Sequence, residues 1–232
     1  MYRYETHLHT APVSRCAKAT VRESLEFYKK RGSDGVFITN HFIDGNINID
    51  RSTPYSERIE FYFSGYEEAL SISEEIGISV FSGVEISYGG TDFLVYGLQK
   101  EWYLAHPEIE GMKKSQLFEL LKAEGALIIQ AHPFREAAYI DHIRLFPRHV
   151  HGVEVVNASR NEFENGMADH YADSYGLIKF AGSDNHSAHR VKRLGGMESP
   201  YRVESEAAFI NGVLSGEIKF FTQKNPLITE EV

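Results

Sequence analysis

The stretch Ala126-Leu127-Ile128-Ile129-Gln130-Ala131-His132-Pro133 decides the fold predicted for this chain. Its short, mostly apolar run follows Gly125 and stops before a proline, a pattern typical of a buried strand. The strand ends at a histidine, so a titratable side chain stands where the strand passes into a loop. Helical patterns at 113–123 and 161–175 lie on either side, and alternation of strands with helices indicates an α/β fold.

The same alternation runs through the whole sequence and predicts one barrel-like domain over residues 1–232. Seven or eight strands alternating with helices favour a barrel related to the (β/α)8 architecture, in which reactive groups lie where strands end. We expect strands at 4–9, 35–39, 78–86, 92–96, 126–130, 152–157, 177–181 and 218–222. We expect helices at 20–30, 56–75, 113–123, 161–175 and 203–214.

Composition narrows the class of protein. A single cysteine, Cys16, precludes an internal disulfide and fits a reducing compartment. No apolar stretch is long enough for a membrane span and the first residues resemble no secretory signal, so we expect a cytoplasmic protein without a membrane partner. The net charge of −9 argues against binding long nucleic acid. It is compatible with a small phosphorylated substrate if bound metal ions supply positive charge.

Histidines and carboxylates recur at the predicted strand ends. His7 and His9 are two positions apart, so in a strand both point to one side and can reach one cation. Asp184 and His186 repeat this spacing after the strand at 177–181, and the small residues before them let the backbone approach a crowded centre. His41 follows the strand at 35–39, and taken alone would be read as a loop residue.

Glu85 and His132 complete the predicted set of strand-end ligands. Glu85 lies in an otherwise apolar strand, where a carboxylate needs a cation or a basic side chain as partner. The tripeptide Ala-His-Pro also occurs around His106, but no buried strand precedes it, so only His132 is assigned to the site. Mixed histidine and carboxylate ligands favour zinc, manganese or iron over calcium.

Together these motifs resemble the PHP (polymerase and histidinol phosphatase) family of phosphoesterases. The matching residues occur in the family's order and span most of the chain. They are His7-Leu8-His9-Thr10, Thr39-Asn40-His41, Gly83-Val84-Glu85, Ala131-His132-Pro133 and Gly182-Ser183-Asp184-Asn185-His186. The resemblance implies an α/β, distorted (β/α)7 TIM-like barrel that holds two or three divalent metal ions.

The resemblance also implies which residues bind which ion. His7, His9, Glu85 and Asp184 would hold the first ion, and Glu85 would bridge to a second ion at His132. His41 and His186 would hold a third.

This chain departs from the family pattern at three places. The family usually adds an acidic residue or a histidine soon after His9, and the stretch 11–16 contains neither, so the third ion is expected to be weak or absent. Asp92 stands where many members have a histidine, either as a replacement ligand or merely as the start of a strand. Asn40 replaces a common aspartate, which removes a supporting carboxylate.

The predicted function is hydrolysis of a small phosphomonoester or phosphodiester by a metal-activated water. Glu85, Asp184 and His186 are the expected catalytic residues, and His186 or His41 could protonate the leaving group. Arg135, and after it Arg15, are the expected phosphate-binding residues, although both could be ordinary surface arginines.

Three alternatives stay open on the sequence alone. The first is an exonuclease or oligonucleotide phosphodiesterase, which stacking aromatics such as Tyr55, Tyr88 or Tyr139 would favour. The second is an amidohydrolase, a class expected to carry a bridging lysine where this chain has Glu85. The third is a non-catalytic metal-binding regulatory domain, supported by the missing ligand after His9. The sequence does not indicate an oligomeric state.

Overall fold

A strongly curved sheet forms the centre of the molecule. The computed structural model describes residues 1–189 and 191–224, and within these the strands form one sheet in the order β7-β6-β5-β4-β3-β2-β1-β8-β9. The strands are β1 (Tyr2–Leu8), β2 (Gly35–Ile38), β3 (Ser79–Tyr88), β4 (Thr91–Tyr96), β5 (Leu127–Ala131), β6 (Gly152–Asn157), β7 (Ile178–Gly182), β8 (Arg193–Ser199) and β9 (Lys219–Lys224).

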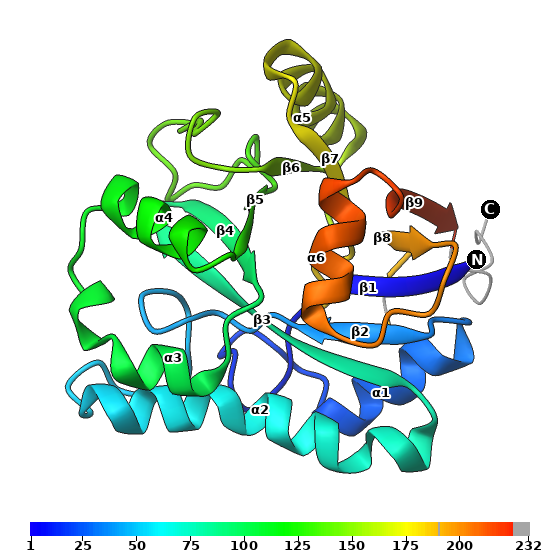
Figure 1. Cartoon of the computed structure of the whole chain (residues 1–232), viewed down its shortest axis with the longest axis horizontal. Coiled ribbons are helices and arrows are strands. Elements are labelled where there is room, and N and C mark those ends of the chain that lie inside the picture. Colours follow the sequence, from blue (N-terminus) through cyan, green and yellow to red (C-terminus); the bar gives the residue numbers. More distant parts are fainter. Residues whose placement is uncertain (190, 225–232) are drawn as a thin grey trace.

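Helices cover the outside of this sheet. They are α1 (Val21–Lys30), α2 (Tyr55–Ile76), α3 (Lys100–Ala105), the short 3-10 helix η1 (Pro107–Ile109), α4 (Lys114–Ala123), α5 (Glu162–Tyr175) and α6 (Glu206–Leu214). Helices α1, α2 and α3 lie along one side of the sheet and α5 lies on the opposite side (Figure 1). α1 begins with a capping box, in which the side chains of Thr20 and Glu23 each accept from the other's backbone N–H. Among the described residues, no helix combines the length and apolar character needed to cross a membrane.

The sheet is a nearly closed barrel, which confirms the predicted fold class. β1, β2 and β3 pair in parallel, as do β5, β6 and β7, so the carboxyl ends of these strands lie on one rim. Contacts between the first and last parallel strands bring the barrel close to closure: the Thr6 hydroxyl donates to the Ala181 carbonyl, and the N–H of His9 donates to the Asn185 carbonyl at 3.1 Å. Residues from the two ends of the chain therefore meet at the rim.

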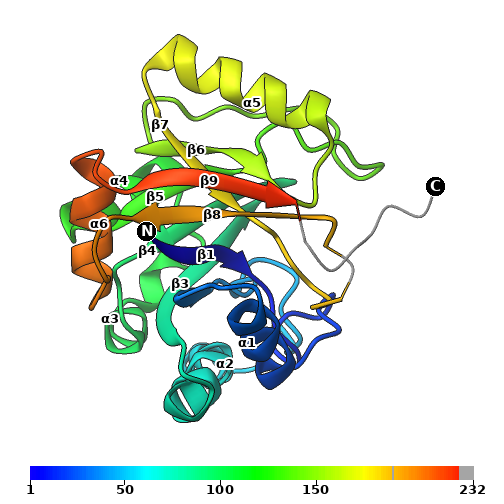
Figure 2. The same ribbon diagram turned by 90° about the vertical axis from the view of Figure 1, so that its right-hand side faces the viewer.

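Two features distort the barrel from regular strand–helix alternation. β3 and β4 form a hairpin without a helix between them, turning at Gly89 and Gly90, which both have positive φ. β4 therefore runs against its neighbours β3 and β5, and Asp92 near its start lies on the rim where the other strands end. β8, which was not predicted, extends the sheet beyond β1, and β9 pairs with it (Figure 2).

The barrel interior is apolar at the end away from this rim. Phe209 of α6 packs against Phe37, Tyr96 and Phe180, with ring centroids 4.5–6.2 Å apart. The last three rings come from β2, β4 and β7, so α6 seals one end of the barrel with aromatic side chains. Polar and charged side chains are consequently concentrated at the opposite end.

Candidate metal centre

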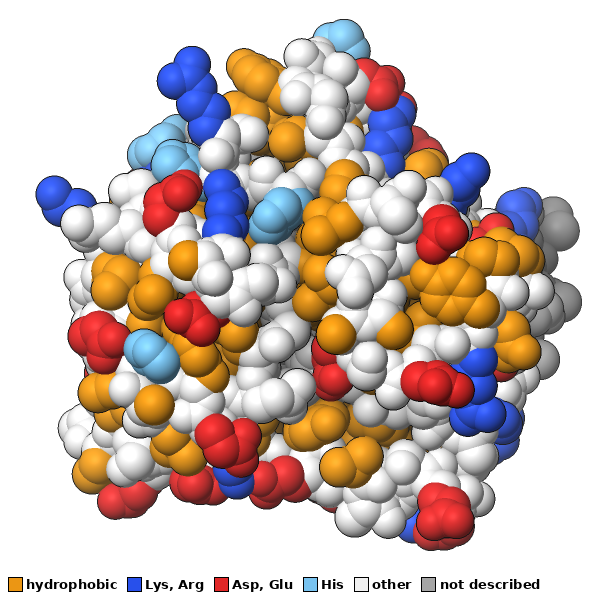
Figure 3. All heavy atoms as spheres, in the orientation of Figure 1, with side chains coloured by type: hydrophobic (Ala, Val, Ile, Leu, Met, Phe, Trp, Pro, Cys, Tyr) orange, Lys and Arg blue, Asp and Glu red, His pale blue; other side chains and the backbone are white. Residues whose placement is uncertain are grey.

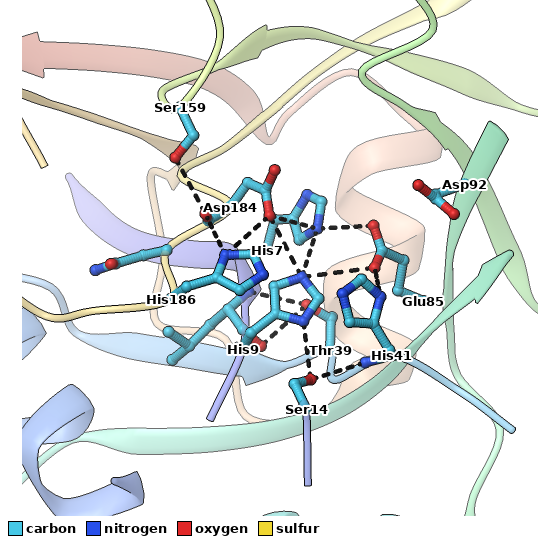
Figure 4. Close-up of polar contacts among 12 residues, drawn as sticks. His7, His9, Ser14, Thr39, His41, Glu85, Asp92, Ser159, Asp184 and His186 are labelled. Carbon is cyan, nitrogen blue, oxygen red and sulfur yellow. Dashed lines mark hydrogen bonds and ion pairs between the residues drawn. The ribbon is translucent and has the colours of Figure 1, made fainter. Parts of the chain in front are cut away.

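His7, His9 and Asp184 converge at the rim although 177 positions separate His7 from Asp184 in the sequence. The Nε2 atoms of His7 and His9 lie 3.1 Å apart, and they lie 3.6 and 3.4 Å from Oδ1 of Asp184. All three side chains are buried. Figure 4 shows both imidazoles pointing toward this carboxylate. The spacing of two positions along β1 aims both rings at one point, as the sequence predicted.

Glu85 lies between this group and a second one. Its Oε1 atom is 3.1 Å from Nε2 of His7 and 3.4 Å from Nε2 of His132. Its other oxygen, Oε2, lies 3.5 Å from Nε2 of His9 and 2.6 Å from Nδ1 of His41. One buried carboxylate thus faces four imidazoles, an arrangement suited to bridging two cations.

His41 and His186 form a third group together with His9. The ring centroids of His9 lie 4.4 Å from those of His41 and 4.2 Å from those of His186. Ligand atoms lie within 4.8 Å of one another in each of three groups, which are His9 with His41 and His186, His7 with Glu85 and His132, and His7 with His9 and Asp184. The structure therefore brings together all seven strand-end residues that the sequence singled out.

Hydrogen bonds to the far side of each ring determine which nitrogen faces the cluster. Nδ1 of His7 lies 2.9 Å from Oε1 of Glu154, a fully buried carboxylate on β6. The same carboxylate accepts from the N–H of His132 and from the Asn157 amide. Since an ionised carboxylate only accepts, Nδ1 of His7 carries the proton and Nε2 presents its lone pair to the cluster.

The tautomer of His9 follows from a chain of three polar residues. The Ser14 hydroxyl donates to Oδ1 of Asn40 at 2.8 Å, and the N–H of Thr10 donates to the same oxygen. Ser14 has then used its only hydrogen, so at 3.1 Å it accepts from Nδ1 of His9. His9 therefore also turns the lone pair of Nε2 toward the cluster. The amide of Asn40 performs the supporting role for which the sequence pattern led us to expect an aspartate.

The donor set lacks the positive charge that its geometry requires. Both oxygens of Glu85 and Nδ1 of His41 are buried and make no hydrogen bond within the described part of the chain, although Oε2 and Nδ1 lie 2.6 Å apart. Lone pairs of His7 and His9 face each other and two carboxylates. Burying hydrogen-bond acceptors close together raises the free energy of the folded state unless a cation lies among them. Nitrogen and carboxylate donors fit zinc, manganese or iron, so the residues suit the divalent ions implied by the resemblance.

Electrostatics lead to the same conclusion. Burial alone would lower the pKa of His7, but Glu154, Asp184 and Glu85 raise it well above its ordinary value. Burial alone would raise the pKa of Glu85, but imidazoles around it, above all His41, lower it well below its ordinary value. With no ion bound, the raised pKa of His7 would place a second proton on its ring, and a bound cation would displace that proton from Nε2 and supply the positive charge in its place.

Backbone strain and a missing side chain accompany the cluster. His132 and Asp184 have φ values of 27° and 51°, in the left-handed region that costs a non-glycine residue about 1–3 kcal/mol. A Cβ atom on Gly182 would lie 2.4 Å from Cβ of His7 and 2.8 Å from Oε1 of Glu154. Only glycine permits this approach, so the small residue before Asp184 has the role that the sequence predicted.

The remaining candidates lie at different distances from the cluster. Oδ2 of Asp92 is 3.8 Å from Nε2 of His132, and it is also 3.6 Å from the Arg135 guanidinium. Arg135 lines the cavity above the cluster and bonds to the Tyr139 hydroxyl. Arg15 is exposed and is not among the residues that line this cavity. His106 ends α3 and stacks on Trp102, which agrees with its exclusion from the site.

A cavity of about 910 Å³ opens over the cluster. Glu85, His41, Asp184 and His186 form part of its wall, and Arg135, Arg160 and Lys192 add three basic side chains. The Nε atoms of Arg135 and Arg160 are buried without a hydrogen-bond partner in the described part of the chain. The exposed acidic residues of α2 lie elsewhere, along the lower edge of the molecule (Figure 3). Because Asp44, Glu85, Asp92 and Asp184 line it as well, the cavity would suit an anion once cations are bound at the ligand groups.

Sequence reasoning missed several residues at this site. Glu154 is a carboxylate within an apolar strand, and the argument applied to Glu85 would have found it. Arg160 and Lys192 lie in loops after β6 and before β8, where sequence gives no sign of direction. Cys16 also lines the cavity, as do His186 and His41. Burial alone would raise the pKa of the Cys16 thiol, but these two histidines lower it to about 6.

Comparison with known proteins shows likeness in structure alone. No family model matches the sequence, and no curated protein matches it. A two-domain protein from Bacteroides vulgatus, containing a predicted PHP-like metal-dependent phosphoesterase, superimposes with a TM-score of 0.62 at 14% identity. The match covers 95% of this chain and 64% of that protein, so this chain spans less than two thirds of its length.

Two further solved structures share the fold. A protein from Bifidobacterium adolescentis, described as a putative metal-dependent phosphoesterase, gives a TM-score of 0.54 at 14% identity over 81% of this chain and 88% of its own. An amidohydrolase from Chromobacterium violaceum gives 0.53 at 15% identity, over 93% of this chain and 96% of its own. These similarities, together with the barrel and its metal-ligand groups, show that the chain has the fold of PHP-like metal-dependent phosphoesterases.

Proposed function

We propose that this protein is a metal-dependent phosphoesterase that hydrolyses a small phosphate ester. The observation that best supports this proposal is a single cavity in which three groups of potential metal-ligating side chains lie beside basic residues on the wall. Histidine and carboxylate ligands alone would suit many hydrolases. The addition of Arg135, Arg160 and Lys192 favours a substrate with a phosphate group, because guanidinium groups bind phosphate oxygens in pairs.

Contacts within the cluster support the assignment of ligands to ions. His7, His9 and Asp184 would hold one divalent ion, and His132 a second, with Glu85 between the two. His41 and His186 would belong to a third. Zinc, manganese and iron all accept this mixture of nitrogen and carboxylate donors. Asp92 lies farther from His132 than Glu85 does, and its contact with Arg135 favours a role in orienting that guanidinium.

The chemistry divides between the ions and the chain. When bound, divalent ions would polarise phosphoryl oxygens and activate water as the nucleophile. Glu85 and Asp184 would be the carboxylate ligands of these ions. Arg135 and Arg160 would bind the phosphate oxygens, whose charge rises in the transition state. Where no third ion occupies His186, which is partly exposed on the cavity wall, its imidazole would hold a proton for the leaving alkoxide.

The amidohydrolase from Chromobacterium violaceum keeps a second hydrolase class in view. Glu85 bridges the cluster where that class is expected to carry a lysine, which argues against amide hydrolysis here. The arginines argue the same way, since a neutral amide offers no charge for them to bind.

Oligonucleotides are the second candidate substrate, because one aromatic residue reaches the cavity. Tyr139 lines it and is largely exposed, whereas Tyr55 and Tyr88 do not line it. A base could stack on this ring while its phosphate lies near Arg135. Release of nucleotides from short oligonucleotides, faster than phosphate from any monoester, would favour this candidate.

A substrate panel tests the proposal. The purified protein, loaded in turn with Mn²⁺, Zn²⁺ or Fe²⁺, would be assayed against phosphomonoesters, phosphodiesters and amides. We expect the unaltered protein to hydrolyse an ester, and we expect Asp184→Asn to reduce the rate of that hydrolysis by more than about 100-fold. Such a loss is larger than the loss of about 10- to 100-fold that is typical of residues that only hydrogen-bond to a metal ligand. Circular dichroism would check that the variant keeps its fold. Amide turnover without ester turnover would favour the amidohydrolase, and metal binding without any turnover would favour a regulatory domain.

A further inference from the structure

The two strands that lead to His7, His9 and Asp184 pair with each other over a short stretch at the rim. There Leu8 and Asn185 form a parallel bridge between the end of β1 and the segment after β7. The N–H of Asn185 donates to the His7 carbonyl at 3.4 Å, and the N–H of His9 donates to the Asn185 carbonyl at 3.1 Å. In the described part of the chain, this bridge is the only backbone pairing between the two strands.

The side chain of Glu5 interrupts the pairing one step below this bridge. If the parallel ladder continued, the N–H of Ser183 would donate to the Glu5 carbonyl and the N–H of His7 to the Ser183 carbonyl. Both N–H groups donate instead to Oε1 of Glu5, at 2.9 and 2.8 Å. The Ser183 carbonyl accepts from the Ser159 hydroxyl at 2.8 Å. One carboxylate oxygen therefore takes the place of two backbone acceptors.

This oxygen is connected to both sides of the first ligand group. It binds the N–H of His7 directly, and it reaches Asp184 through Ser183, the residue before it. Glu5 is 2% exposed, so water does not compete for these bonds. Nε2 of His7 and Oδ1 of Asp184 lie 3.6 Å apart, and a functional site requires its ligands to be held within about 0.5 Å of their working positions. The position of Oε1 therefore affects whether both side chains can bind one ion.

We propose that Glu5 is a positioning residue of the metal centre, and that the reach of its side chain sets the spacing between His7 and Asp184. The inference rests on the proposed metal-binding function. Glu5 belongs to none of the three ligand groups, so it acts through the backbone of its neighbours. Accepting two N–H groups requires an oxygen in the right place and does not require a negative charge.

Two replacements of Glu5 separate reach from charge. Glutamine keeps the length of the side chain and an acceptor oxygen, but it removes the charge. Aspartate keeps the charge, but it is one methylene shorter and brings its oxygens less far toward Ser183. We expect Glu5→Asp to lower metal affinity by about 10- to 100-fold, measured by competition with a chromogenic chelator. Glu5→Gln should bind metal as tightly as the unaltered protein does.

Thr6→Val is the matched control for a merely structural role. The Thr6 hydroxyl donates to the Ala181 carbonyl, so it also joins β1 to β7, but it bonds neither to a ligand nor to a residue beside one. Its loss should lower Tm and leave metal affinity unchanged. Circular dichroism would show at which temperature each variant is folded, and affinities would be compared below the lowest of these temperatures.

Amide hydrogen exchange on the unaltered protein adds a measurement that does not depend on the folding of any variant. If Glu5 holds the two strands together without help from an ion, the N–H groups of His7 and Ser183 should stay as protected after chelation as those of β5. Loss of their protection on chelation would overturn the inference.

The affinities separate this inference from the proposed function. A folded Glu5→Asp with unaltered metal affinity, or equal losses in Glu5→Asp and Glu5→Gln, would overturn the inference and leave the proposed function standing. An unaltered protein that binds no divalent ion would overturn both.

Discussion

Nδ1 of His7 lies 2.9 Å from Oε1 of Glu154, so a buried carboxylate on β6 fixes the ring that faces the cluster from β1. Glu154 also binds the backbone N–H of His132 and the Asn157 amide. Asn157 in turn reaches Oδ2 of Asp184 at 3.3 Å. Glu154, which does not line the cavity, thus orients ligands on three strand ends.

Replacement Glu154→Gln should weaken metal binding while preserving side-chain volume. The glutamine amide can donate to Nδ1 of His7, which would move the ring proton to Nε2 and remove the lone pair that faces the ion. We expect a loss of about 10- to 100-fold in metal affinity, measured by competition with a chromogenic chelator. Glu68→Gln, on the exposed face of α2, is the control. Unchanged affinity in Glu154→Gln would refute the role given to this carboxylate.

The basic residues of the cavity wall should contribute to substrate binding. Arg135→Ala and Arg160→Ala should each lower kcat/KM for a phosphomonoester by about 10- to 100-fold, since each removes charge-assisted hydrogen bonds. Arg148→Ala, an exposed change outside the cavity, serves as control. Arg15→Ala should cost less than either, because Arg15 does not line the cavity. A larger loss at Arg15 than at Arg160 would favour the assignment made from sequence.

Removal of the ions should destabilise the fold. Without a cation, the cluster would bury several carboxylates and lone pairs that face one another. At a free-ion concentration about 100 times Kd, binding contributes about 2.7 kcal/mol, so chelation should lower Tm by roughly 5–10 °C in a chain of this size. Differential scanning calorimetry with and without chelator measures the shift. An identical Tm in both conditions would show that the folded chain binds no ion.

The pair of Arg58 and Glu110 predicts a pH-dependent stability away from the site. The buried Arg58 guanidinium binds both oxygens of Glu110 at 2.6 Å, and it lowers the pKa of that carboxyl below its ordinary value of 4.5. Because the pKa of Glu110 is lower in the folded protein than in the unfolded chain, the pair stabilises the fold fully at pH values above the ordinary pKa of 4.5. This stabilisation is lost as the pH falls through the lowered pKa of the folded protein.

Glu110→Gln should therefore destabilise the protein by about 1 kcal/mol at neutral pH, an amount limited by solvent screening of the half-exposed carboxylate. Urea unfolding at several pH values measures it. The difference from the unaltered protein should vanish in acid. A difference that persists unchanged below the folded pKa would contradict this electrostatic origin.

The sequence predicted those parts of the fold that leave a periodic signal. Buried strands such as β5 are short apolar runs, and the i, i+2 spacing of His7 and His9 follows from strand geometry alone. β8 was missed because its sequence, Arg193-Leu194-Gly195-Gly196-Met197-Glu198-Ser199, shows no alternation of apolar and polar residues. The reversed direction of β4 was also missed, although the short connection through Gly89 and Gly90 leaves no room for the crossover that a parallel neighbour of β3 would need.

The sequence predicted which residues belong to the site, but it did not predict the contacts between them. A histidine at a strand end is visible in sequence, whereas the tautomer of His9 depends on Ser14 and Asn40, which reach it only in the folded chain. Arg160 and Cys16 come from loops, whose paths are set by tertiary contacts. The sequence therefore named Arg15, which does not line the cavity, and did not name Arg160, which does.

Anomalous diffraction from crystals grown with zinc tests the central claim most directly, because it locates metal ions independently of any substrate. We predict one anomalous peak bounded by His7, His9 and Asp184, and another between Glu85 and His132. Crystals in which these side chains keep their places with no anomalous density among them would contradict the account.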